Sequence, residues 1–160
     1  MTDNIERLQQ LLNITDKEAF HLSGVSQRLY NRLPTTPEQL ETALKNPEFI
    51  DTLESFTAKF ARLQDTIADK LLPIFLINAG EKKGTVIENL NRAEALSLIS
   101  DTQSWLATRS LRNKLVHEYI ADYKELYEAI TLAREFSNEL IATQKAIKQY
   151  CNQILNIEQK

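Results

Sequence analysis

Apolar residues recur at every third or fourth position over most of the chain, which is the spacing of one helical face. Between residues 48 and 79 this stripe consists of Ile50, Leu53, Phe56, Phe60, Leu63, Ile67 and Leu71. Between residues 122 and 157 it consists of Leu126, Ile130, Ala133, Phe136 or Ser137, Leu140, Ile147, Cys151 and Ile154. No stretch shows the alternation of a strand. The pattern predicts an all-α protein whose two long helices are antiparallel partners.

Helix start and stop signals divide the rest of the chain. The stretch "TDKE" at Thr15 is typical of a capping box, so we expect one helix over residues 3 to 13 and another from Thr15 to the residues before Pro34. A brief helix follows in "TPEQLETALKN". Pro73 should kink or interrupt the first long helix, and Gly80 should end it. Shorter helices are expected in "TVIENLNRAEALSLI" and after Ser100-Asp101.

No internal repeat, low-complexity tract or long linker separates two domains. We therefore expect an up-and-down helical bundle over residues 47 to 160, preceded by a helical N-terminal extension over residues 1 to 46.

Composition narrows the possible functions. The 160 residues carry a net charge of −3, so the protein as a whole does not attract phosphates, and any nucleic-acid contact must be local. Cys151 is the single cysteine, which excludes a disulfide or a multi-cysteine metal site within one chain. The N-terminus lacks the pattern of a signal peptide, and the longest apolar run, "LLPIFLI", is too short to span a bilayer. We expect a cytoplasmic protein without a membrane segment.

A polar cluster, "RSLRNKLVHEY", interrupts the amphipathic pattern at residues 109 to 119. A helical wheel groups Ser104, Thr108, Leu111 and Leu115 as the core face, with Trp105 and Tyr119 near its edges. The opposite face contains Leu106, Arg109, Asn113, Val116 and His117. A face that mixes aliphatic residues with Asn, Arg and His is typical of a contact with another subunit.

The residue types in this cluster permit a specific chemistry. Arginine is a permanent forked cation suited to phosphate, and histidine can move protons near neutral pH. Arg112, Asn113 and His117 could therefore cleave RNA without a metal or cofactor, by attack of the 2′-hydroxyl on its own phosphate. Arg112 and His117 lie about 140° apart on the wheel, so the length of the arginine side chain, a bend near His117 or a two-fold dimer would be needed to bring them together. On chemistry alone, a solvated helix surface is the commoner interpretation.

The sequence "RNKLVHEY" resembles the signature of HEPN domains, in which a polar residue follows an arginine and a histidine comes four to six residues later. Tyr119 extends the match to the His-x-Tyr form of HepT-type toxins. The order of helices over about residues 48 to 155 is similar to that branch, whereas residues 1 to about 46 have no counterpart in it.

The resemblance implies a metal-independent endoribonuclease toxin whose composite site forms in a homodimer. It implies a catalytic role for Arg112 and His117, supported by Asn113. It also implies a partner, an MNT-type nucleotidyltransferase antitoxin, that neutralises the toxin by transferring AMP to Tyr119. An adenylyl phosphate there would repel an RNA backbone and fill the cleft.

Other residues carry weaker hypotheses. Arg109, Lys114 and Arg92 could attract RNA phosphates. Asp65 and Glu88 could contact and orient the catalytic side chains. For His21 we expect a structural or solvated role, and for Trp105 a core or interface role. Tyr123 and Tyr127 are less favoured modification sites.

Two other classes of function compete with the toxin. One is a non-catalytic, substrate-binding subunit of a nucleotidyltransferase, and the other is a structural helical adaptor. A pure scaffold has no chemical need for Arg112, Asn113, His117 and Tyr119 together, which favours the toxin.

Overall fold

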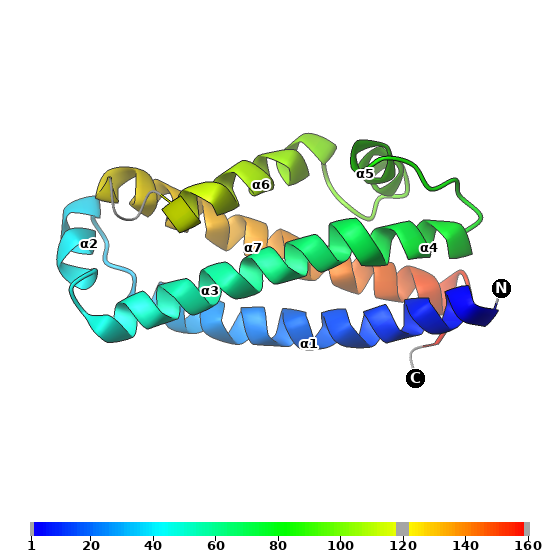
Figure 1. The fold of residues 1–160 in the computed structure, drawn as a ribbon, viewed down its shortest axis with the longest axis horizontal. Coiled ribbons are helices and arrows are strands. Elements are labelled where there is room, and N and C mark those ends of the chain that lie inside the picture. Colours follow the sequence, from blue (N-terminus) through cyan, green and yellow to red (C-terminus); the bar gives the residue numbers. More distant parts are fainter. Residues whose placement is uncertain (1, 118–121, 159–160) are drawn as a thin grey trace.

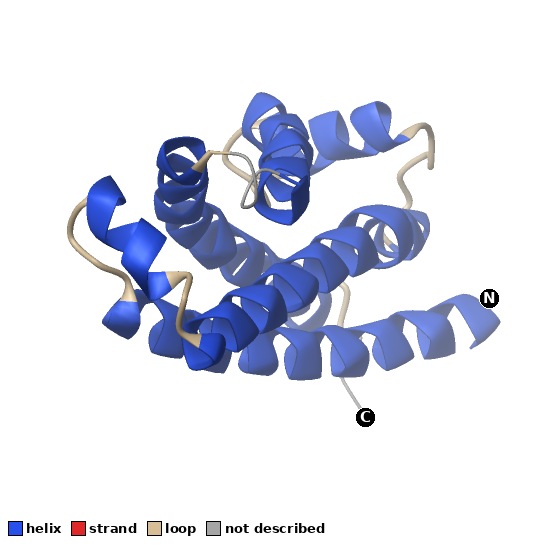
Figure 2. Ribbon diagram, turned by 60° about the vertical axis from the view of Figure 1, so that its left-hand side comes forward, coloured by secondary structure: helices blue, strands red, loops and turns tan. Residues whose placement is uncertain are grey.

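The computed structural model describes residues 2–117 and 122–158; the side chains of Thr2, Val116 and His117 are outside this description. Every regular element in these residues is a helix, as the sequence predicts (Figures 1 and 2). Three long helices, α1 (Thr2–Arg32), α3 (Pro47–Thr66) and α7 (Tyr123–Gln153), pack together around one hydrophobic cluster. No helix among these residues is both long enough and apolar enough to cross a membrane.

Helix α1, Thr2–Arg32, packs extensively on both α3 and α7. It is continuous, so the predicted break before Thr15 is wrong. The Thr15 hydroxyl is buried and donates to the carbonyl of Leu11 at 2.8 Å instead of capping a new helix. It also accepts from Nε2 of Gln144 on α7, at 3.2 Å. This long-range contact stabilises Thr15 inside a helix.

The next two helices begin where the local signals place them. Helix α2, Pro37–Ala43, is capped by Thr36, whose hydroxyl accepts from the amide of Gln39. Helix α3, Pro47–Thr66, is capped by Asn46, whose side chain accepts from the amide of Glu48. A proline occupies the first turn of each helix, where its missing N–H costs nothing.

Pro73 interrupts the α-helical pattern, as expected, through a wider turn on its N-terminal side. The turn η1, Ile67–Leu71, is π-helical, and the amide of Leu72 donates to the carbonyl of Ile67. Pro73 then lies in the first turn of α4, Leu72–Asn78. Proline has no N–H and its ring clashes with the carbonyl four residues back, and the π-turn accommodates both effects. Gly80, at φ +77°, follows the end of α4.

Helix α5, Val86–Ala95, starts with a complete capping box in which Thr85 and Glu88 bond reciprocally. Helix α6, Thr102–His117, follows Asp101, whose carboxylate accepts from the amide of Gln103 at 3.0 Å. Helix α7, Tyr123–Gln153, is capped by Asp122. These starts agree with the expected segment boundaries.

The directions of the helices correct the predicted pairing. Figure 1 shows α3 and α7 running the same way, with α1 and α6 running the opposite way. Tyr30, near the end of α1, stacks edge-on against Phe56 of α3 and donates to the carbonyl of Ile130 of α7. Phe75 of α4 contacts Tyr150 of α7 near the other end of the bundle, where their ring centroids are 5.3 Å apart. Helices α3 and α7 are therefore parallel, because α6 returns along the bundle before α7 begins.

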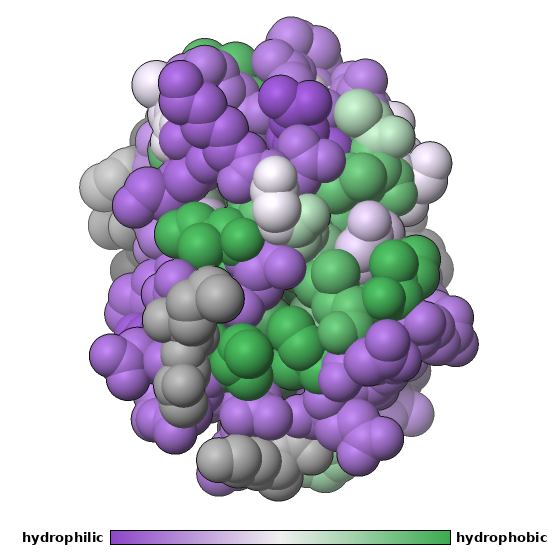
Figure 3. Space-filling model, turned by 90° about the vertical axis from the view of Figure 1, so that its right-hand side faces the viewer, coloured by the Kyte–Doolittle hydropathy of each residue, from purple (hydrophilic) through white to green (hydrophobic). Residues whose placement is uncertain are grey.

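The core-facing stripe of α7 is largely as predicted, with Ser137 rather than Phe136 fully buried. Ile154 is 60% exposed, so the prediction that the stripe reaches this residue is wrong. Helix α7 ends at Gln153, and Nε2 of Gln9 donates to the carbonyl of Glu158 beside the start of α1. Figure 3 views this end of the molecule and shows apolar side chains gathered among hydrophilic ones.

The proposed division at residue 46 stays a prediction. Leucines of α1 belong to the same hydrophobic cluster as residues of α3 and α7. Any function assigned to residues 1 to 46 must accordingly be compatible with their packing in the core.

Candidate functional site

Helix α6 carries the polar cluster, and one buried face of α6 packs against the core. Thr108, Leu111 and Leu115 are buried as predicted, and Ser104 is half-buried. Trp105 is 3% exposed, which confirms a core position and excludes a surface stacking platform. At the start of α6, hydrogen bonds from the Ser104 hydroxyl and the Gln103 amide lower the pKa of Asp101. An ionised carboxylate at the N-terminus of a helix interacts favourably with the helix dipole and stabilises the helix.

Arg112 forms the shortest ion pair among the described residues. Its Nη1 donates to Oδ1 of Asp65 on α3 at 2.6 Å, and the two side chains are 29% and 47% exposed. No second acceptor among the described residues bonds this guanidinium. Most of its donors therefore stay available to a phosphate, while Asp65 fixes its position.

A second ion pair runs beside the first. Nη2 of Arg109 donates to Oδ1 of Asp69 in the π-turn at 3.2 Å. Arg109 and Arg112 are three residues apart on α6, and Asp65 and Asp69 are four apart on α3 and η1. Both spacings place side chains on one face of a helix, so two parallel bridges join the helices.

The two pairs enclose an open cleft of about 330 Å³, lined by Asp65, Asp69, Arg109, Arg112 and Asn113. Asn113 is exposed and lines the same cleft as Arg112. Formal charges in the cleft cancel, since two arginines face two aspartates. The cleft is thus suited to orient a bound phosphate, and it offers little net attraction at long range.

The remaining predicted site residues are distributed unevenly. Lys114 is exposed and lies outside the residues that line the cleft. His117 is the last residue of α6, and its side chain is outside the described part. Tyr119, the predicted AMP acceptor, is also outside the described residues. The structure therefore brings together Arg112, Asn113 and Arg109, and leaves the placement of the histidine and tyrosine side chains as predictions.

Arg92 and Glu88 belong to a different region from the cleft. Arg92 pairs with Glu81 at 3.4 Å. Glu88 accepts from the amide of Thr85, and the bonds from this residue lower the pKa of the Glu88 carboxyl. Helix capping accounts for Glu88. Tyr127 also has a structural contact, since its hydroxyl donates to the carbonyl of Pro34 at 2.8 Å.

Asp69 is a cleft-lining residue that the sequence analysis did not single out. The sequence suggests Asp65 as a supporting residue but does not indicate that it pairs with Arg112. The available signal was the pair of acids four residues apart just before Pro73, matched by two arginines on a later helix. Only the packing of α3 and η1 beside α6 shows that these pairs meet.

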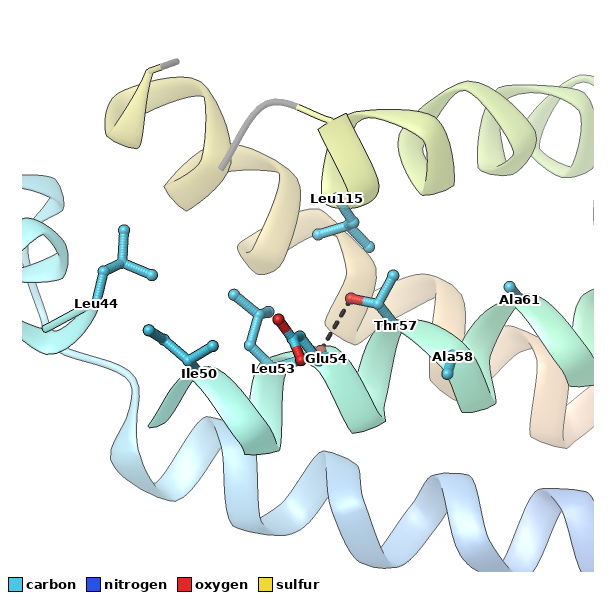
Figure 4. A pocket seen from close by; sticks show the side chains of 8 residues that line it. All are labelled: Leu44, Ile50, Leu53, Glu54, Thr57, Ala58, Ala61 and Leu115. Carbon is cyan, nitrogen blue, oxygen red and sulfur yellow. Dashed lines mark hydrogen bonds between the residues drawn. The ribbon is translucent and has the colours of Figure 1, made fainter. Parts of the chain in front are cut away.

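An apolar groove, separate from this cleft, is lined in part by Leu115. It has a volume of about 360 Å³ and is bounded by Leu44 at the end of α2, by residues from Ile50 to Ala61 of α3, and by Leu115. Figure 4 shows Leu115 pointing from α6 toward α3, with Leu53 and Thr57 on the opposite wall. Its lining is mainly apolar, with Glu54 as the charged member. The groove thus differs chemically from the cleft around Arg112.

Potential metal ligands are dispersed in the part of the chain that the structure describes. No three His, Cys, Asp or Glu side chains there are placed to hold a metal ion together.

Comparison of the chain with protein-family models, with curated proteins and with solved structures found no match in any of the three.

Proposed function

We propose that this protein is an endoribonuclease toxin of the HEPN type. The observation that carries the proposal is the presentation of Arg112 and Asn113 together in an open cleft on α6, directly before the helix ends at His117. The alternating directions of α1, α3–α4, α6 and α7 are consistent with the HEPN-like bundle that the motif implies. The sequence motif, the helix order and the cleft are the basis of this assignment.

In the proposed reaction the 2′-hydroxyl of RNA attacks the adjacent phosphorus, and the bond to the 5′-oxygen breaks. His117 accepts or delivers the proton, and the guanidinium of Arg112 stabilises the charge on the phosphorane. Asp65 keeps Arg112 over the cleft without using its remaining donors. In a homodimer, the second copy would supply another Arg112–His117 set across a shared cleft.

The proposed control of the activity is AMP transfer to Tyr119 by an MNT-type nucleotidyltransferase. The modification adds a negative phosphate two residues after His117 in the chain. That charge would compete with RNA for Arg112 and repel the substrate backbone. The proposed location is the cytoplasm, where both RNA and ATP are available.

Expression of the protein alone tests the toxin function. Growth should stop, and RNA should be cleaved in the presence of EDTA; Arg112→Ala or His117→Ala should abolish both effects. Ser110→Ala is a matched control, because Ser110 is exposed on α6 outside the cleft lining. If both motif variants are as toxic as the parent protein, the nuclease assignment is wrong.

Intact mass measurement tests the modification. After incubation with the partner and ATP, the protein should gain the mass of one or more AMP groups, and Tyr119→Phe should gain none. A binding protein that associates with the nucleotidyltransferase but never cleaves RNA would favour the substrate-binding subunit instead.

A further inference from the structure

The cleft around Arg112 carries no net charge, so it does not explain how a polyanion would be attracted. Binding of a nucleic-acid backbone depends on cations that release its condensed counterions. Arg109 and Arg112 are each already paired with a carboxylate. The cations that attract a strand must therefore lie elsewhere on the surface.

A small groove between α1 and α3 concentrates such cations. It has a volume of about 170 Å³ and is lined by Ile14, Lys17, Glu18, His21, Lys59 and Arg62. We call this the α1–α3 groove. Among the described residues, no carboxylate lies within ion-pair distance of Lys17, Lys59 or Arg62. Lys59 donates instead to the Ser55 hydroxyl at 2.8 Å.

Glu18 is the one acid in the lining, and its carboxylate is turned into the helix interface. Its Oε2 accepts from the Thr66 hydroxyl at 3.1 Å, while Oε1 is buried without a hydrogen-bond partner. Burial raises the pKa of this carboxyl, against the opposing effects of Thr66, Arg62 and Lys70. Lys17, His21 and Arg62 are exposed. The outward surface of the groove is consequently cationic in a protein whose net charge is −3.

An exposed aromatic ring borders these cations. Phe20 is 75% exposed, the highest value among the large hydrophobic residues described as exposed. Its ring centroid lies 5.7 Å from that of His21, in an edge-to-face arrangement. Proteins that bind single-stranded nucleic acids combine a cationic groove with aromatic rings on which unpaired bases stack. Both parts are present here.

The groove and the candidate site both take residues from the C-terminal half of α3. Arg62 lines the groove, and Asp65, three residues later on the same helix, holds Arg112. Three residues are nearly one helical turn, about 4.5 Å along the axis. The groove and the cleft therefore draw on residues within about one turn of the same helix.

We propose that the α1–α3 groove binds the phosphate backbone of single-stranded RNA through Lys17, His21, Lys59 and Arg62, with a base stacked on Phe20. The binding surface stands on its own observations, and its role in delivering RNA to Arg112 rests on the proposed function. The groove supplies affinity, whereas the cleft supplies orientation and chemistry.

Anisotropy of a labelled single-stranded RNA tests the groove, in a His117→Ala background that keeps the RNA intact. The double variant Lys17→Glu/Arg62→Glu should weaken binding at least tenfold. Loss of two phosphate contacts should reduce the slope of log Kd against log salt by about 1.4. Lys82→Glu/Lys83→Glu is the matched control, because it changes the net charge equally at two exposed loop lysines. Equal weakening in both double variants would overturn the proposal.

Two further comparisons define the ligand. Phe20→Ala should weaken single-stranded RNA roughly fivefold or more and leave double-stranded RNA unaffected, because only unpaired bases can stack. Lys17→Gln/Arg62→Gln, which removes charge without reversing it, should give an intermediate loss while circular dichroism shows an unchanged fold. If heparin binds as tightly as RNA and Phe20→Ala weakens neither ligand, the groove is a general polyanion-binding surface. That result would contradict the RNA proposal.

Cleavage kinetics separate this proposal from the proposed function. If the parent protein cleaves RNA and the groove double variant has the same Kd and KM as the lysine control, the groove is not the binding surface. If the parent protein binds RNA through the groove but never cleaves it, the groove proposal stands and the nuclease proposal fails.

Discussion

Arg112 of α6 and Asp65 of α3 form an ion pair in which Nη1 lies 2.6 Å from Oδ1. The pair joins the helix of the sequence motif to a helix that precedes it by more than forty residues. A carboxylate in this position can orient the guanidinium, and it also neutralises one charge of the cleft. Orientation of the guanidinium should favour catalysis, whereas neutralisation of a positive charge should weaken the binding of RNA.

Asp65→Asn should separate the two effects. We expect kcat for RNA cleavage to fall roughly tenfold, about 1.4 kcal/mol, because Arg112 loses its oriented partner. KM should fall or stay constant, because the cleft gains net positive charge. The free energy of unfolding should change by less than about 1 kcal/mol, since both side chains are partly exposed. Steady-state cleavage and urea titration measure these quantities.

Asp69→Asn is the matched control for that variant, because Asp69 pairs with Arg109, which lies outside the proposed catalytic pair Arg112 and His117. It should keep kcat near that of the parent protein. Equal losses of kcat in both variants would show that the bridges serve only to join α3, η1 and α6.

Two phenylalanines provide a test of where the core lies. Phe56 is fully buried and contacts the rings of Tyr30 and Phe60, whereas Phe20 is 75% exposed. Phe56→Ala should lower the free energy of unfolding by about 3–5 kcal/mol, because it leaves a cavity beside two rings. Phe20→Ala should change it by no more than about 0.5 kcal/mol. Chemical denaturation followed by circular dichroism gives both values; a similar loss in the two variants would contradict this core.

Local signals in the sequence predicted most helix starts, because caps act over three or four residues. Thr36, Asn46 and Asp122 each satisfy an amide of the helix that follows. Thr15 shows the limit of such signals. Its capping pattern is overridden by a contact with Gln144, which is 129 residues away in the chain.

The candidate site was predictable in part for the same reason. Arg112 and Asn113 are neighbours in one motif, so the sequence alone places them together. The ion pairs to Asp65 and Asp69 depend on how α6 packs beside α3 and η1, and no local pattern fixes that packing. The parallel course of α3 and α7 was missed similarly, because it depends on the return of α6 between them.

Gln144 links α7 to α1 through a buried polar contact. Its Nε2 donates to Oδ1 of Asp16 at 2.7 Å and to the Thr15 hydroxyl at 3.2 Å, and the side chain is 2% exposed. Gln144→Ala should lower the free energy of unfolding by about 1–3 kcal/mol, because it removes two bonds in a closed site. Gln153→Ala, at an exposed position of the same helix, should have almost no effect. Thermal melts of the two variants compare these positions, and equal midpoints would contradict a stabilising role for the contact.

Cys151 should make the stability of the protein depend on alkaline pH. The thiol is fully buried in α7, and burial raises its pKa from 9.0 to about 11. A raised pKa in the folded state means that the unfolded state loses its proton first as the pH increases. Stability is therefore complete below pH 9.0 and declines as the pH rises through about 11.

The magnitude of this effect follows from the shift of about two pKa units, which corresponds to about 2–3 kcal/mol. Urea titrations at pH 8 and at pH 11 should show a larger loss of unfolding free energy for the parent protein than for Cys151→Ala. The difference between the two proteins removes the contribution of Tyr30, whose pKa is also raised by burial. Thiol modification by a disulfide reagent at pH 8 should be slow in the folded protein and fast in urea. Rapid modification of the folded protein, or identical pH dependence in Cys151→Ala, would contradict a buried, protonated thiol.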